Sequence, residues 1–339
     1  MKNLRLAVLG CGFWSRFQVA GWKELEGVDI AAAYNRTVSK AEKLAQEFGI
    51  PHVYGDAEEL LRKEDIHVVD VITDVDTHAQ FVDLAARYGK AVICQKPMAP
   101  NLETARRMVA ACRDAGVPFY VNENFRWQAP IRRLKAIIES GEIGEPFNAR
   151  VTFCSGFPVF DNQPFLAELE QFILTDIGSH ILDVSRFLMG DVEVLYCQTK
   201  RVNPKIKGED VANVLMRMKN GRHCFVEMSY ASILETEVFP QTLALIEGSE
   251  GSVQLKPGFI LTITTRKGTR AETASPKVYP WVDPAYAVVH SSIVDAQRNI
   301  LAGLRGETGA ETTGEDNLKT VELVFGAYES AAKRLAVCV

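Results

Sequence analysis

The first 122 residues alternate short apolar runs with charged segments, and this alternation restricts the fold more than any other feature. The runs are apolar at consecutive positions, as expected of strands that are covered on both faces of a sheet. They are Leu4–Leu9, Val28–Tyr34, Val68–Thr73, Ala91–Cys94 and Phe119–Asn122. Strand followed by helix, repeated, predicts a parallel, doubly wound α/β sheet.

The segments between these runs carry apolar residues at the helical period. They are Glu42–Phe48, Ala57–Lys63, Ala79–Tyr88 and Leu102–Ala115. From about residue 146 the pattern changes to strands separated by turns. Asn220-Gly221 predicts a hairpin within Val211 to Tyr230. Further strands are expected at Leu243–Glu247, Ser252–Leu255 and Phe259–Thr265.

The change of pattern predicts two domains. Residues 1–124 are expected to form a dinucleotide-binding domain, and residues 125–339 an α/β domain with a mainly antiparallel sheet. Near the C-terminus, Thr312 and Glu315 have the spacing of a capping box and predict the start of a long helix.

Composition points to small-molecule partners. The net charge of -5 and the pI of about 5.8 provide no basic field for nucleic acid or for an anionic membrane surface. The chain has no apolar run of membrane-spanning length, and the apolar start leads into a glycine motif rather than a cleavage site. Seven scattered cysteines without a C-x-x-C pair predict free thiols in the cytoplasm and no metal site.

Gly10-Cys11-Gly12-Phe13-Trp14 follows the first predicted strand directly. A G-x-G turn lets backbone N–H groups approach a pyrophosphate at the N-terminus of the next helix. Ser15 stands where the third glycine is usual, and a plain tight turn is the alternative. The position between a strand and a helix favours dinucleotide binding.

Asn35 and Arg36 end the second predicted strand. NAD-binding proteins usually place a carboxylate there, where it accepts hydrogen bonds from the ribose hydroxyls. An uncharged Asn35 next to a guanidinium favours the 2′-phosphate of NADP. The alternative is a solvated Arg36, with Asn35 binding the ribose of NAD.

Two further stretches carry groups suited to catalysis. Lys96 follows a strand and precedes Pro97, so it lies where parallel strands deliver residues to a ligand crevice. Asp176 and His180 are four residues apart and would share a helix face. The histidine could accept a hydroxyl proton near neutral pH, and a solvated surface pair is the alternative. Asp183 is interpreted as a structural partner.

Taken together, the chain resembles the glucose–fructose oxidoreductase / inositol dehydrogenase (Gfo/Idh/MocA) family along nearly its whole length. The matching stretches are GCGFW, VITDVDTHAQFVDLAARYGKAVICQKPMAP, NENFRWQ, DIGSHILD and TTGEDNLKTVELVFGAYESAAK. The resemblance implies a Rossmann domain followed by a domain whose large open sheet often builds dimers or tetramers. It also implies that Lys96, Asp176 and His180 surround the substrate carbon and the nicotinamide.

Other site residues follow from the same resemblance. Gln95 stands where the family usually has Glu, and Thr73-Asp74 where many members have Thr-Pro. His78 keeps the usual position and is expected near the nicotinamide. The expected cofactor contacts are Gly10, Gly12, Phe13, Trp14, Asn35, Arg36, Thr73, His78, Gln95 and Lys96. Beside the three catalytic residues, the expected substrate contacts are Asn124, Arg126 and Trp127, for which packing at the domain junction is the alternative.

These expectations combine into one reaction. The predicted function is reversible hydride transfer between NAD(P) and a secondary alcohol or ketone of a sugar, sugar derivative or cyclitol. Two alternatives are an enzyme that cleaves or epimerises a glycoside while retaining its cofactor, and an NAD(P)-binding regulator without catalysis. The expected partners are the sugar or polyol and further copies of the chain, as a homodimer or homotetramer.

Overall fold

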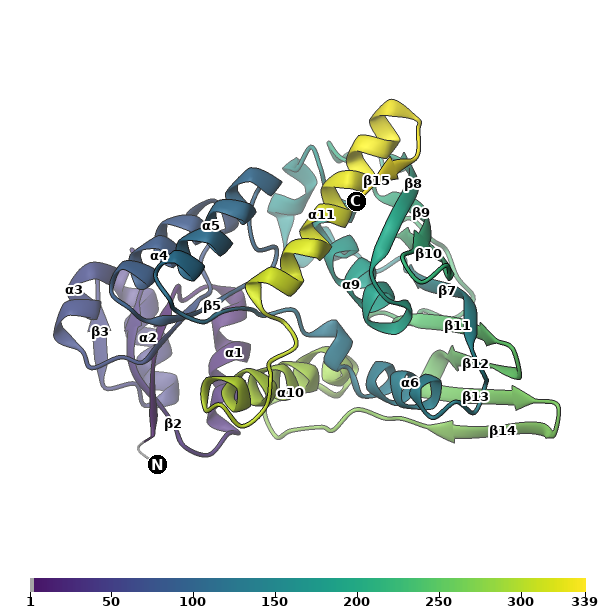
Figure 1. Cartoon of the computed structure of the whole chain (residues 1–339). Coiled ribbons are helices and arrows are strands. Elements are labelled where there is room, and N and C mark those ends of the chain that lie inside the picture. The colour runs from purple at the N-terminus through teal and green to yellow at the C-terminus, as the bar shows by residue number, and fades with distance from the viewer. Residues whose placement is uncertain (1–2) are drawn as a thin grey trace. The chain divides into compact units, whose positions relative to one another are not determined.

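The computed structural model describes residues 3–339. The chain divides into two compact units between Asn124 and Phe125 (Figure 1). Two later segments return to the first unit, Tyr279–Asp283 and His290–Val321. The second unit therefore consists of Phe125–Val278, Pro284–Val289 and Glu322–Val339. The sequence expectation was two consecutive domains, residues 1–124 and 125–339. In the structure, segments of the C-terminal part alternate between the two units.

The first unit contains a six-stranded sheet in the order β3-β2-β1-β4-β5-β6, with every pair parallel. Its strands are β1 (Leu4–Leu9), β2 (Val28–Tyr34), β3 (His52–Tyr54), β4 (Val68–Val71), β5 (Ala91–Cys94) and β6 (Phe119–Val121). This is the predicted doubly wound sheet. The order reverses between β1 and β4, and ligands of such sheets bind beyond the carboxyl ends of the strands at that point.

Helices follow the strands of this sheet: α1 (Phe13–Lys23), α2 (Val38–Phe48), α3 (Ala57–Lys63), α4 (Val75–Arg87) and α5 (Leu102–Asp114). Two C-terminal helices come later, α10 (Ala287–Leu304) and α11 (Gly314–Lys333). The apolar core includes Trp22 of α1 and Ile300 of α10, both fully buried. The C-terminal part of the chain thus completes the core of the first unit.

Two local features differ from the sequence expectation. β3 has only three residues and was not predicted, because so short a run shows no recognisable period. α11 begins one residue later than expected: Thr313, not Thr312, accepts the hydrogen bond from the backbone N–H of Asp316 at 3.1 Å. Thr312 is instead buried, and its carbonyl accepts a hydrogen bond from the backbone N–H of Val121.

The second unit contains a nine-stranded sheet in the order β14-β13-β12-β11-β7-β10-β9-β8-β15. Its strands are β7 (Pro146–Cys154), β8 (Val192–Lys200), β9 (Val211–Met218), β10 (His223–Ser229), β11 (Leu243–Gly248), β12 (Gly251–Lys256), β13 (Ile260–Thr265), β14 (Gly268–Thr273) and β15 (Val337–Cys338). The β7–β10 pair is parallel and the other pairs are antiparallel. The predicted hairpin at Asn220-Gly221 and the antiparallel strands after it are confirmed.

Two helices, α6 (Ala129–Glu139) and α9 (Gly178–Met189), pack against this sheet (Figure 1). α9 contacts the central strands β7 and β10, and α6 contacts β12 and β13. The shorter helical segments are η1 (Phe125–Trp127), α7 (Val159–Asn162), η2 (Pro164–Glu168), α8 (Ile173–Asp176), η3 (Pro257–Phe259) and η4 (Pro284–Tyr286). The predicted fold class, a Rossmann domain plus a domain with a large, mainly antiparallel sheet, is confirmed.

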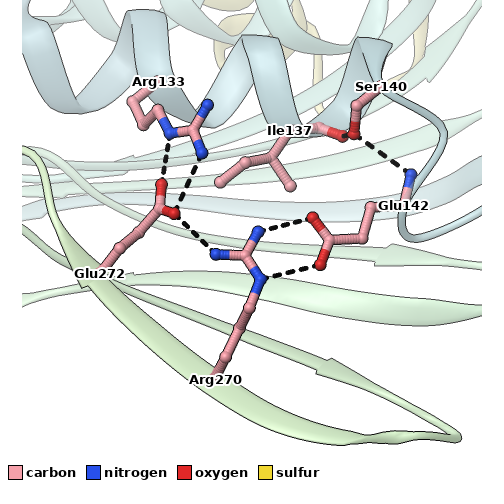
Figure 2. A network of polar contacts seen from close by, with 6 residues as sticks. All are labelled: Arg133, Ile137, Ser140, Glu142, Arg270 and Glu272. Carbon is pink, nitrogen blue, oxygen red and sulfur yellow. Dashed lines mark hydrogen bonds and ion pairs between the residues drawn. The ribbon is translucent and has the colours of Figure 1, made fainter.

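The outermost strand β14 is tied to α6 by a network of charges (Figure 2). Glu272 of β14 pairs with Arg133 of α6, and its Oε2 accepts a hydrogen bond from Arg270 at 2.6 Å. Arg270 also donates two hydrogen bonds to Glu142, at 2.9 and 2.6 Å. Five of the six residues of this strand are exposed, so these charges replace the apolar contacts that hold the central strands.

Candidate active site

The glycine turn after β1 brings the chain close to the loop after β4. Gly10 has a φ of +104°, and a Cβ there would lie 2.6 Å from the carbonyl oxygen of Ile72. Gly12, which precedes the first residue of α1, has open space where its Cβ would be. No side chain caps this helix start. Uncapped amides at a helix start are groups that can bind a phosphate, and the predicted roles of Gly10 and Gly12 stay predictions.

A cavity of about 300 Å³ lies beside this turn. Its lining includes Asn35, Arg36 and Lys40, at the end of β2 and in the first turn of α2. The side chain of Asn35 is bonded to the backbone on both sides: Oδ1 accepts from the N–H of Cys11 at 3.0 Å, and Nδ2 donates to the carbonyl of Thr37 at 3.0 Å. Asn35 therefore holds the glycine turn against the end of β2.

Arg36 and Lys40 are exposed cations at the wall of the cavity. The sequence interpretation named Arg36 and missed Lys40. Its position shortly after Arg36, in the first turn of the helix that follows β2, was the signal available for Lys40. The cavity lining carries the two cations and one carboxylate, Asp74, and it has an uncharged asparagine where a ribose-binding carboxylate is usual.

The side chain of His78 forms hydrogen bonds to two loops at the carboxyl ends of the strands. Its ring is buried, with Nε2 3.0 Å from the carbonyl oxygen of Thr73 and Nδ1 3.2 Å from the carbonyl oxygen of Met98. Burial lowers the pKa of His78, and the hydrogen bonds to backbone carbonyls oppose that shift. The ring links the loop after β4 with the turn that follows Lys96. The predicted contact of Thr73 and His78 with the cofactor stays a prediction.

In the turn after β5, the uncharged side chain of Gln95 has a structural role. Gln95 is buried, and its side-chain Oε1 accepts a hydrogen bond from the backbone N–H of Lys96 at 2.9 Å. An amide oxygen accepts this bond as a carboxylate would. The Lys96–Pro97 peptide bond is cis. Gln95 thus orients the backbone that carries Lys96.

Asp176 and His180 lie on two helical segments rather than one. Asp176 ends α8, Ile177 separates the segments, and His180 lies in the first turn of α9. The prediction of one continuous helix is therefore wrong at Ile177. Asp176 also has a partner that the sequence did not reveal. The hydroxyl of Tyr230, the residue directly after β10, donates to its Oδ2 at 3.4 Å. Burial raises the pKa of Tyr230 well above its usual value, and Asp176 raises it further, which keeps the donor proton in place.

The segment after β6 packs its side chains against α9 and α10. The ring of Phe125 stacks on the imidazole of His180, with centroids 3.9 Å apart and planes at 10°. Arg126 forms two hydrogen bonds with Asp183, at 2.7 and 2.5 Å. Asn124 donates to the hydroxyl of Ser292 at 2.7 Å.

Trp127 has the guanidinium of Arg132 over its ring, 4.2 Å from the centroid. These contacts match the packing alternative for Asn124, Arg126 and Trp127. Their roles as substrate contacts stay predictions. Asp183 has the structural partner expected for it.

Other kinds of site find little support. Within residues 3–339, no three His, Cys, Asp or Glu side chains gather as a metal ion would require. The seven cysteines are free thiols. In the part of the chain that the structure describes, no helix is long and apolar enough to cross a membrane.

Two family models match the chain. The oxidoreductase family with an NAD-binding Rossmann fold (GFO_IDH_MocA) matches residues 4–123, and the GFO/IDH/MocA C-terminal domain matches residues 131–254. The chain belongs to this oxidoreductase family. The membership confirms the resemblance found in the sequence and the predicted class of enzyme, an NAD(P)-dependent oxidoreductase of a family that acts on carbohydrate CH–OH groups.

Similar proteins cover nearly the whole chain. A D-apiose dehydrogenase of Rhizobium rhizogenes is 44% identical over 98% of this chain and 96% of its own length. A D-apiose dehydrogenase of Paraburkholderia graminis is 44% identical over 98% of this chain and 88% of its own length. An oxidoreductase from Agrobacterium radiobacter, solved with NAD⁺, L-tartaric acid and magnesium, is 44% identical with a TM-score of 0.97 over 99% of this chain and 98% of that one.

Proposed function

We propose that this chain is a sugar dehydrogenase that oxidises D-apiose, or a pentose of closely similar shape, with NAD(P). The glycine turn and its open position at Gly12 support dinucleotide binding. The near-full-length similarity to two D-apiose dehydrogenases carries the choice of substrate. Residues 1–124 are proposed to hold the dinucleotide, and residues 125–339 to bind the sugar and other copies of the chain.

The proposed chemistry assigns one role to each predicted catalytic residue. The nicotinamide supplies the hydride acceptor when it is bound. His180 takes the hydroxyl proton as the C–H bond breaks. Lys96 donates a hydrogen bond to the reacting oxygen and stabilises its developing negative charge. Asp176, held by the Tyr230 hydroxyl, orients the substrate by hydrogen bonding.

The cofactor pocket is proposed to accept both nicotinamide dinucleotides. Asn35 carries no charge that would repel a 2′-phosphate, and Arg36 and Lys40 would attract one. The solved relative at 44% identity was crystallised with NAD⁺, which supports NAD as well. The preference for NADP predicted from the charges alone stays a prediction.

The decisive experiment is a panel of sugars and polyols that includes D-apiose, run with NAD and with NADP and followed by nicotinamide absorbance. D-apiose should give the highest kcat/KM, with a ratio between the two cofactors within about tenfold. Lys96→Met and His180→Asn should each lower kcat by at least about 100-fold. Both variants should keep their dinucleotide affinity. Near-normal rates in both variants would contradict the mechanism.

Two other outcomes of the same panel would replace the proposal. Product formed without net change in NAD(P)H would point to glycoside cleavage or epimerisation with retained cofactor. Dinucleotide binding without turnover on any compound would point to a regulator. The proposed catalytic residues argue against a regulator, because a sensor needs neither a general base nor a catalytic cation.

We also propose a homodimer or homotetramer in the cytoplasm. A row of aligned residues crosses five neighbouring strands of the second sheet: Tyr196, Leu215, Phe225, Arg150 and Leu245. Leu215 is 53% exposed, and a second copy would bury it. The free cysteines fit a reducing compartment. Analytical ultracentrifugation tests the assembly, and a monomer at micromolar concentration would contradict it.

A further inference from the structure

The 3₁₀ turn η1 is attached to α9 by two consecutive side chains. The ring of Phe125 covers the imidazole of His180, and the guanidinium of Arg126 is paired with Asp183 one helical turn later. Phe125 and His180 are 4% and 5% exposed, and Asp183 is fully buried. The bidentate ion pair therefore fixes the turn that presents Phe125 to His180.

The stack restricts how the imidazole can turn. The last torsion of a histidine side chain has broad minima, so an unsupported ring would sample many orientations. With the planes at 10° and the centroids 3.9 Å apart, rotation would drive the edge of the imidazole into the face of Phe125. Both ring nitrogens therefore point along directions that Phe125 determines.

The stack also places an aromatic face against a group that becomes positive during the proposed reaction. The face of a benzene ring carries negative charge density and attracts a cation that lies over it. Neutral imidazole gains little from this, whereas imidazolium gains more. Phe125 therefore favours the state of His180 that forms as the hydroxyl proton is transferred.

Several charged or titratable groups of the second unit surround this pair. Asp176 comes from α8, and the hydroxyl that contacts it belongs to Tyr230, directly after β10. Asp183 and Arg186 come from α9, 3.7 Å apart, and Arg126 comes from η1. These groups are present in the wild type and in every Phe125 variant, so they do not by themselves account for a difference between the variants.

We infer that Phe125 is a positioning residue for His180, which orients the imidazole for proton transfer and stabilises its protonated form. The inference rests on the proposed role of His180 as the base. Phe125 touches His180 rather than the substrate in this account, so its effect must be visible in the pH profile and not only in the rate.

Phe125→Leu tests the inference, because leucine keeps an apolar side chain but removes the aromatic face. The acid limb of log kcat/KM against pH should move down by about half a pH unit, since the protonated form of the base loses its stabilisation. kcat should fall about tenfold through loss of orientation. Phe125→Tyr keeps the face and should restore the wild-type midpoint. Phe125→Met serves as a second non-aromatic variant if the leucine variant does not fold.

Phe187→Leu is the matched control. Phe187 lies on α9, as His180 does, and its ring lies under the cations Arg132, Lys135 and Arg126, at 5.0, 5.3 and 5.7 Å. Its substitution therefore alters the surroundings of Arg126 but leaves the ring that faces His180 in the chain. The same substitution there should leave the midpoint of the acid limb unchanged. An equal shift in both leucine variants would overturn the inference, because it would then reflect general loss of packing on α9.

His180→Asn separates this inference from the proposed function. If that variant keeps a near-normal rate, both the assignment of the base and the role of Phe125 are wrong. If it is inactive while Phe125→Leu keeps the wild-type midpoint, the proposed function stands and the inference about Phe125 alone is wrong.

Discussion

Asp70 in the first unit and Asp183 in the second are both completely buried carboxylates, yet their partners differ. Asp70 accepts hydrogen bonds from two neutral donors, the indole N–H of Trp22 at 2.8 Å and the amide of Asn122 at 3.0 Å. Asp183 accepts two hydrogen bonds from the guanidinium of Arg126. A buried carboxylate can therefore be stabilised either by neutral hydrogen-bond donors or by a neighbouring cation.

Because it is buried and its partners are neutral, Asp70 has a raised pKa. Burial raises its pKa from 3.8 to about 6, although the hydrogen bonds from Trp22 and Asn122 lower it. Neutral donors therefore compensate only part of the desolvation penalty. An ion pair compensates differently, because each charge cancels the field of the other, and removal of one partner leaves the second charge buried.

The exposed network around Glu272 provides a third case. Arg133 and Arg270 hydrogen-bond this carboxylate, which remains partly exposed to solvent, and they lower its pKa to about 2 (Figure 2). Water and salt screen exposed charges, so a large shift in pKa at the surface corresponds to a small contribution to stability. We therefore expect the loss of stability on disrupting each site to be largest for the Asp183 pair, smaller for Asp70 and smallest for Glu272.

The largest effect is expected when the cation of the buried pair is removed. Arg126→Met should destabilise the fold by about 3–5 kcal/mol, because Asp183 then has lost its main partner in a buried environment. The double variant Arg126→Met/Asp183→Leu should recover much of that loss, since neither charge of this pair remains and the buried Arg186 keeps its ion pair with Asp191 at 3.0 Å. Urea unfolding followed by circular dichroism measures both. A single variant as stable as the double variant would show that the pair contributes no more than an exposed one.

A smaller, pH-dependent effect is expected at Asp70. Its folded-state pKa lies above its unfolded value, so the folded state loses stability as pH rises from about 4 to 6. The loss should reach about 3 kcal/mol above pH 6, from the shift in pKa. Asp70→Asn lacks this term, so its stability relative to wild type should increase by that amount between pH 4 and 7.

Unfolding midpoints of both proteins across this pH range test the prediction for Asp70. The asparagine leaves one of the two donors without its acceptor, but that cost does not vary with pH. Parallel stability curves would therefore mean that the folded-state pKa of Asp70 is not raised.

The smallest effect is expected at Glu272. Its folded-state pKa is depressed, so its contribution is present above the unfolded pKa of about 4.5 and is lost as pH falls toward 2. Glu272→Gln should lower stability by about 1 kcal/mol or less at pH 7, and by less still in high salt. The difference from wild type should shrink as pH falls from 5 to 3.

Glu250→Gln is the control for the network, because Glu250 has a single exposed pairing with Arg266 at 3.9 Å. Its effect should be within a few tenths of a kcal/mol of zero. A loss at Glu272 as large as that at Arg126 would mean that the network, and not burial, decides the strength of these pairs.

Much of the fold could be predicted because local patterns encode it. β1, β2 and β5 begin and end where the apolar runs do, and the Asn220-Gly221 turn lies at the predicted hairpin. The glycine turn was recognisable because only glycine fits the close approach at Gly10. The division between α8 and α9 left no signal in the sequence, and it is slight, because Ile177 keeps helical angles, with φ of −83° and ψ of −28°.

The amino-acid sequence by itself determined the alternation of strands and helices, the glycine turn, and the residue types suited to hydride transfer. These features depend on neighbours within a few positions, which a pattern can show. The tertiary structure alone decided the partners: Arg126 with Asp183 across 57 positions, Asp70 with Trp22 across 48, and the stack of Phe125 on His180. Such contacts form only when distant segments pack together and exclude water, and no local period records which buried charge will meet which donor.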